Sequence, residues 1–334
     1  MKDVNNLPPL MAEGKNSKKR STRGKSFGYQ VLGFGAGCGQ IPAYVVATGG
    51  SPCAGTSVGD YKIHSFTGDG TLTVSCAGNS AGSNKIDYYV VAGGGGGGGD
   101  DGGGGGAGGF RESVPGSGAW TASPLANPGN ARPVTATDYP IAVGGGGGGG
   151  PNGIGSAGSV SSFHDITSAG GGAGLRLTPC SCAGDGGSGG GADVVAATGG
   201  SGNVPCVSPA QGKDGGNCDT PNASGGGGGA TTAGGPNTPP KTGGPGGAGA
   251  TSCFSNSPVI KAGGGGAGAN NVGGAGGPGG GGEGGDYPQP SHGKGEDGAV
   301  NSGGGAGGGG NNPQPARYGG TGGSGIVIVR YKFQ

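Results

Sequence analysis

The sequence predicts an all-β protein, in which a small β-sheet or sandwich base carries glycine-rich arms packed as polyglycine II helices. Three observations support this fold class. Glycine makes up 100 of the 334 residues and occurs in uninterrupted blocks such as 93–99 and 144–150. The apolar residues cluster in short runs that are rich in β-branched and aromatic side chains, which favour strands. No stretch has the apolar periodicity of a helix.

Order in the glycine blocks must come from the backbone itself. A segment without side chains cannot build a hydrophobic core, so only backbone hydrogen bonds and close backbone packing can hold it. Leu, Ile, Val and Phe together number 44 residues, which is below the fraction of about 20% that a conventional core needs. We therefore expect the few apolar residues to gather in one base.

The first part of the base is predicted over residues 36–92. Its strand signals are 43–47, 61–67, 71–76 and 85–92. The second and third of these flank Gly68-Asp69-Gly70, a short run of turn-forming residues, and are predicted to form a β-hairpin. The last one leads directly into the first glycine block, so the base is expected to adjoin the arms.

The glycine-rich arms are predicted over residues 93–324, with one strand near 139–143, and residues 325–334 are predicted to form a C-terminal strand that completes the base. Ile326 and Ile328 alternate with Val327 and Val329. Because successive side chains of a strand point to opposite faces, this strand has two apolar faces. It is expected to lie centrally in the sheet or to be covered on both sides.

Three structures compete for the arms. A flexible coil is the simplest one, whereas collagen is excluded because blocks of seven glycines break its three-residue repeat. In polyglycine II, extended threefold helices pack side by side, and Pro245 with Ala248, and Ala275 with Pro278, would line an edge. Ordering a residue costs about 1–2 kcal/mol, so isolated arms are expected to be mobile, and bundling and oligomerisation, for example as a trimer, favour rigid packing.

Residues 1–35 form a basic leader in a chain whose formal net charge is +1. We interpret the leader as an anchor that docks on another protein, while a solvated tail without fixed partners remains the alternative. The leader has no secretory signal and the chain has no apolar run that would span a bilayer, so we expect a protein without membrane insertion. The candidate docking residues are Lys18, Lys19, Arg20, Arg23, Lys25, Phe27, Tyr29, Leu32 and Phe34.

No motif in the sequence favours catalysis, a cofactor or a metal. The eight cysteines fit disulfide staples or free thiols better than a zinc site, for which the candidates are Cys180, Cys182, Cys206 and Cys218. The adjacent Asp100 and Asp101 are either solvated or bind a cation. Repeated Arg-Gly-Gly units, on which glycine-rich RNA-binding segments depend, are absent from the sequence. We therefore expect a non-enzymatic protein without specific nucleic-acid binding.

The order of these strand and glycine motifs resembles a known family. The motifs at 61–71, 88–92, 139–143 and 322–331 are similar to the glycine-rich domain of structural and fibre proteins of tailed bacteriophages, particularly marine ones. The resemblance covers roughly residues 60–334. The arms alone are also similar to the polyglycine II tail-fibre tip adhesins of T-even-like phages. This resemblance implies a virion component that is assembled in the host cytoplasm and exposed on the particle exterior.

The expected function is that of a phage tail fibre or tip, or of a fibre that decorates the capsid, with other virion proteins and a host cell-surface receptor as partners. A glycine-rich matrix or surface-layer protein of a cell is the alternative. Bulky residues among the glycines are either host contacts, because no local core is near them, or plugs that fold back against the base. These residues are Phe110, Arg111, Trp120, Phe163 and Tyr287.

Overall fold

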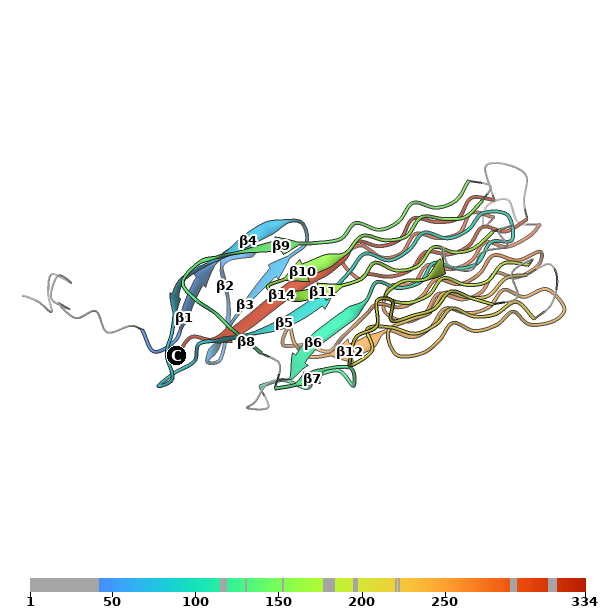
Figure 1. Ribbon diagram of the computed structural model, residues 1–334. Helices are drawn as coiled ribbons and strands as arrows, with labels where there is room; N and C mark the ends of the chain where they lie inside the picture. Colours follow the sequence, from blue (N-terminus) through green and yellow to red (C-terminus); the bar gives the residue numbers. More distant parts are fainter. Residues whose placement is uncertain are drawn as a thin grey trace, which may run out of the picture. The chain divides into compact units, whose positions relative to one another are not determined.

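The computed structural model describes residues 42–114, 119–129, 131–151, 153–176, 184–194, 198–219, 221, 223–288, 293–311 and 317–334. The chain divides into two units, Met1–Pro42 and Ala43–Gln334. The described residues of the second unit contain strands and extended segments and no α-helix, which confirms the predicted all-β class. Figure 1 shows the strands of this unit together, with the glycine-rich segments running from them side by side.

One layer of the base is a five-stranded antiparallel sheet of order β1-β4-β9-β10-β11 within the described residues. Its strands are β1 (Val45–Thr48), β4 (Gly70–Ala77), β9 (Asp138–Ala142), β10 (Ser161–Phe163) and β11 (Ile166–Ser168). The predicted strand near 139–143 is β9. It joins the base directly before a glycine block, as the sequence indicates.

The second layer is a sheet of order β2-β3-β14-β5-β6-β7, with β8 paired to β5, again within the described residues. Its pairs are antiparallel except β6 with β7. The strands are β2 (Ser51–Val58), β3 (Tyr61–Phe66), β5 (Lys85–Val91), β6 (Phe110–Val114), β7 (Asn127–Pro128), β8 (Arg132–Pro133) and β14 (Ile326–Lys332). The C-terminal strand therefore lies between β3 and β5, in the centre of this sheet.

Two hydrophobic cores cover the two faces of the second sheet. The inner core lies between the two sheets, and the outer core lies beneath the hairpin of β12 (Ala250–Ser252) and β13 (Val259–Lys261) and the loop that carries Trp120. Val327 and Val329 belong to the inner core, and Ile326 and Ile328 belong to the outer core. This confirms the prediction that the last strand is covered on both faces.

Two predictions about the base need correction. The runs 61–67 and 71–76 are strands β3 and β4, but β3 pairs with β2 and β14, whereas β4 pairs with β1 and β9. The predicted hairpin is thus a crossing between the sheets, because Phe66 and Leu72 both bury their side chains in the inner core. Second, residues 93–324 return to the base more often than expected, since β6 to β13 all lie within them.

Candidate functional site

The predicted docking residues and the predicted host contacts occupy different parts of the chain. The nine docking candidates between Lys18 and Phe34 lie outside the described residues, so their role stays a prediction. Arg111 lies half-buried on β6, where its Nη1 approaches the carbonyl oxygen of Thr167 at 3.5 Å. Tyr287 is 40% exposed, and its backbone N–H donates to the carbonyl of Asn271.

Three of the candidate host contacts are buried, which favours the second of the two alternatives, that they are plugs folded back against the base. Phe110 and Trp120 belong to the outer core, with exposed fractions of 1% and 8%, and Phe163 is fully buried in the inner core. Phe110 packs edge-to-face on Tyr89, with 5.0 Å between the ring centroids. This is the plug arrangement, in which the rings pack against the faces of the second sheet.

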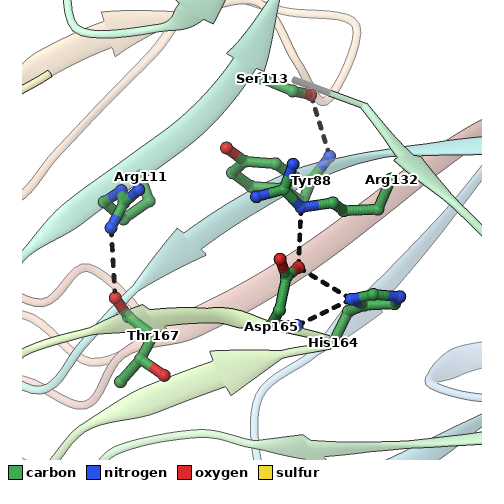
Figure 2. Close-up of polar contacts among 7 residues, drawn as sticks. All are labelled: Tyr88, Arg111, Ser113, Arg132, His164, Asp165 and Thr167. Atoms are coloured by element: carbon green, nitrogen blue, oxygen red, sulfur yellow. Dashed lines mark hydrogen bonds and ion pairs between the residues drawn. The ribbon is translucent and has the colours of Figure 1, made fainter. Parts of the chain in front are cut away.

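A polar cluster holds the β10–β11 turn against the segment that carries β8 (Figure 2). The Asp165 carboxylate accepts from Arg132 Nε at 2.7 Å and pairs with His164 Nδ1 at 2.8 Å. Partial burial would raise the pKa of Asp165, but the hydrogen bond from His164 and the charge of Arg132 more than offset this effect, so its pKa is lowered. The charges of Asp165 and Arg132 compensate one another, which favours a clamp between the β10–β11 turn and β8.

The most distinctive feature of the structure is the packing of the glycine-rich segments, which we call the glycine lattice. In the segment 93–99, the backbone N–H groups point to three different neighbouring segments in strict rotation along the chain. The N–H groups of Gly93, Gly96 and Gly99 donate to the carbonyls of Ser159, Ser156 and Gly153. A repeat of three residues is the helical repeat of polyglycine II.

The same segment also accepts hydrogen bonds from three further segments, so within the described residues it has six bonded neighbours. It donates to 153–159, 320–323 and 103–106, which run antiparallel to it, and accepts from 147–150, 171–174 and 306–309, which run parallel to it. The segment 102–109 has a similarly complete set of partners. These two segments lie in the interior of the lattice, and every backbone group between Gly93 and Gly98 is paired.

Glycine is required in this interior because the segments approach one another too closely for a side chain. A Cβ on Gly97 would lie 1.9 Å from the carbonyl oxygen of Gly307, and one on Gly94 would lie 2.0 Å from that of Gly304. At the border the requirement ends, because a Cβ on Gly145 or Gly148 would meet no atom within 4 Å. The predicted edge is also a border, since Pro245, Ala275 and Pro278 are exposed and Ala248 is half-buried.

At the end remote from the strands, a set of charged residues joins the ends of the lattice segments. This distal cluster consists of Asp100, Asp101, Arg176 and Arg317. Asp100 and Asp101 form the turn between the two interior segments, both with a left-handed φ of 57°. Asp100 Oδ2 lies 2.7 Å from Arg176 Nη2 and 3.7 Å from Arg317 Nη1, and Ser224 Oγ donates to the Asp101 backbone carbonyl.

Sequence reasoning identified the two aspartates but not their partners. They are neither solvated nor arranged with other acidic groups, because Asp101 is 6% exposed and Asp100 pairs with arginine. Arg176 and Arg317 lie 141 positions apart in the sequence, and no local motif joins them. The sequence gives only a weak indication of this cluster. Each arginine interrupts a glycine-rich segment, and the two aspartates interrupt a third one.

Within the described residues, no group of three or more His, Cys, Asp and Glu side chains is arranged to hold a metal ion. Of the cysteines proposed for zinc, Cys180 and Cys182 lie outside the described residues, and Cys206 carries an exposed free thiol. The described part of the chain contains no helix with the length and apolar character needed to cross a membrane.

A family model covers most of the chain. The model of a family described as "Glycine-rich domain" matches residues 67–332. These residues include β5, β14 and all the segments of the glycine lattice. No curated protein matches the chain.

Proposed function

The chain belongs to the glycine-rich domain family, and on this premise we propose that it is a non-enzymatic structural component of a bacteriophage virion. It would be a tail fibre or tip, or a fibre that decorates the capsid. The observation that carries the proposal is the complete set of backbone partners around the interior segment 93–99. Such packing supports a rigid structural role, because hydrogen bonds to six neighbouring segments restrict the backbone of glycine, which is otherwise the most flexible residue type.

The free-energy terms that order an interior glycine nearly balance. Fixing one residue costs about 1–2 kcal/mol. An interior glycine gains roughly 0.5–1.5 kcal/mol from a backbone hydrogen bond. It gains about 0.5–1 kcal/mol more from a Cα–H···O contact, because a carbonyl oxygen of a neighbouring segment lies close to its Cα. Because these terms are of similar size, the lattice depends on the strands of the base, which hold the segment ends together.

We propose that the basic leader docks the protein on another virion protein. Deleting residues 1–35 should leave a folded body that no longer enters particles, because the strands of the base and the lattice all lie after residue 42. The measurement is mass spectrometry of purified particles assembled with the full or the shortened chain. Normal incorporation of the shortened chain would refute the anchor.

We propose Tyr287 and Arg111 as the remaining candidates for contact with a host receptor. Tyr287→Ala should lower adsorption of particles to host cells without changing the melting temperature, because its side chain is exposed. Trp120→Ala is the comparison variant. Because Trp120 is buried in the outer core, this substitution should lower the melting temperature. Unchanged adsorption of the Tyr287 variant would remove this residue from the proposal.

Association of several copies is also proposed, with a trimer as one possibility. Gly145 and Gly148 are exposed and have open space beside Cα, so a segment from another copy can pack there. Replacing both glycines with valine should shift the sedimentation equilibrium toward the monomer. An unchanged distribution would contradict association through this border.

The decisive experiment for the whole proposal is immunogold labelling of purified particles with antibodies against residues 43–334, together with mass spectrometry. Labelled tails or capsids are expected. Labelling of cell surfaces in the absence of particles would favour the alternative, a matrix or surface-layer protein.

A further inference from the structure

The distal cluster contains buried polar atoms that its ion pairs leave unused. Among the described residues, Arg176 Nε, Arg176 Nη1, Arg317 Nε and Asp101 Oδ1 are buried and have no hydrogen-bond partner. The side chain of Arg176 is only 10% exposed, and Asp101 is 6% exposed. Burial of a polar group without a partner is unfavourable, so three such donors at one end of the lattice call for an acceptor.

The two guanidinium groups converge on one point. Arg176 Nη2 and Arg317 Nη1 approach the same atom, Asp100 Oδ2, at 2.7 and 3.7 Å. They come from different lattice segments, 169–176 and 317–325, whose positions are fixed by backbone hydrogen bonds to the interior segments. The remaining donors therefore belong to two guanidinium groups that share one aspartate oxygen, and a guanidinium group pairs best with a planar or tetrahedral oxyanion.

We propose that the distal cluster binds an oxyanion, a carboxylate, sulfate or phosphate group, between Arg176 and Arg317. The anion accepts from the unused N–H groups of the two arginines, while Asp100 continues to neutralise part of their charge. This site is independent of the virion proposal, because it concerns the isolated chain.

Binding at this site is coupled to Asp101. Burial, and then the neighbouring Asp100 carboxylate, raise the pKa of Asp101 to about 6. The positive charges of Arg176 and Lys241 and a hydrogen bond from Asn311 oppose this rise. A bound anion adds negative charge and raises this pKa further. Asp101 then holds a proton, and binding strengthens as the pH falls through about 6.

The test is isothermal titration of the full chain with inorganic sulfate, whose charge is constant between pH 5 and 8. We expect saturable binding that weakens roughly ten-fold or more in Arg176→Gln and in Arg317→Gln, as loss of charge-assisted hydrogen bonds predicts. Arg111→Gln, which removes an arginine of the base, is the matched control and should bind normally. Asp101→Asn should bind without the pH dependence.

Two further measurements distinguish loss of the site from loss of folding, and an anionic group on a polymer from a small solute. Arg317→Lys keeps the charge but lacks Nε, so it should weaken sulfate binding while its thermal unfolding matches that of the parent. Binding to dextran sulfate beads, but not to dextran, would indicate an anionic group carried by a polymer, and binding of free sulfate alone would indicate a small solute. The site is refuted if the folded parent binds no sulfate, or if both arginine variants bind it as the parent does.

Discussion

The indole Nε1 of Trp120 donates a 2.9 Å hydrogen bond to the buried carboxylate of Glu112, and this pair fastens the outer core. The same carboxylate accepts from Ser252 Oγ at 2.7 Å and from the Ser123 backbone N–H at 3.0 Å. The guanidinium group of Arg330 lies over the Trp120 ring, 5.0 Å from its centroid. One carboxylate therefore joins β6, the loop that carries Trp120 and the β12–β13 hairpin.

Removing this carboxylate should destabilise the base strongly. Glu112→Ala leaves three buried donors without a partner, and the expected loss in the free energy of unfolding is about 3–5 kcal/mol. Glu112→Gln should lose less, because an amide oxygen still accepts. Denaturant unfolding measures both, with Glu283→Ala as the control, since Glu283 is exposed. Equal stability of Glu112→Ala and the control would contradict the fastening role.

The lattice predicts that the same substitution, glycine to alanine, destabilises the protein at one position and has little effect at another. Gly97→Ala places its Cβ 1.9 Å from the Gly307 carbonyl oxygen, so the segments must separate, and we expect a loss of about 1–3 kcal/mol or more. Gly148→Ala meets no atom within 4 Å and should leave stability within about 0.5 kcal/mol of the parent. Thermal unfolding compares them directly. Similar melting temperatures for both variants would mean that the interior is less tightly packed than described.

The sequence predicted those parts of the fold that depend on local patterns. The alternation from Ile326 to Val329 correctly indicated a strand with two covered faces, and the three-residue spacing of Pro245 and Ala248 correctly indicated a lattice border. Both follow from the geometry of a single segment. Blocks of bare glycine likewise restrict the possible packing, since only a backbone lattice can order them.

Features that depend on which segments become neighbours could not be predicted. Phe110 lies next to glycine in sequence, and its burial depends on Tyr89 and on a hairpin about 140 residues further along the chain. The separation of β3 and β4 into different sheets depends on the inner core between the sheets, in which Phe66 and Leu72 are both buried. Arg176 and Arg317 meet at Asp100 only because the lattice aligns the ends of three segments.

Asp87 predicts a stability that rises in mild acid. Burial raises its pKa to about 6, whereas an unfolded aspartate has a pKa near 3.9. Between these values the folded state binds more protons, so the free energy of unfolding attributable to Asp87 increases as the pH falls from 7 to 4, by up to roughly 2 kcal/mol. His64 acts in the opposite direction below about pH 6.5, because burial lowers its pKa.

The contribution of Asp87 is isolated by comparison with Asp87→Asn, which keeps the acceptor for Ser113 Oγ. The variant should match or exceed the parent in stability at pH 8, and its advantage should shrink as the pH falls below 6. Urea unfolding at several pH values measures this difference. A constant difference across the range would show that the folded state does not hold the extra proton on Asp87.

Amide hydrogen exchange should separate the interior of the lattice from its border. The N–H groups of Gly95 and Gly105 donate to the carbonyls of Gly106 and Ala306 at 2.8 Å, inside six neighbouring segments, so they can exchange only when the lattice opens. Gly145 and Gly148 are exposed, and neither donates to a backbone carbonyl of the described residues. We expect the interior amides to exchange at least about a thousand-fold more slowly than these border amides.

Because all four residues are glycines in glycine blocks, their intrinsic exchange rates are similar, and each pair serves as the control for the other. Exchange within seconds at Gly95 and Gly105 would mean that the segments are mobile loops, and the rigid structural role proposed for them would then fail.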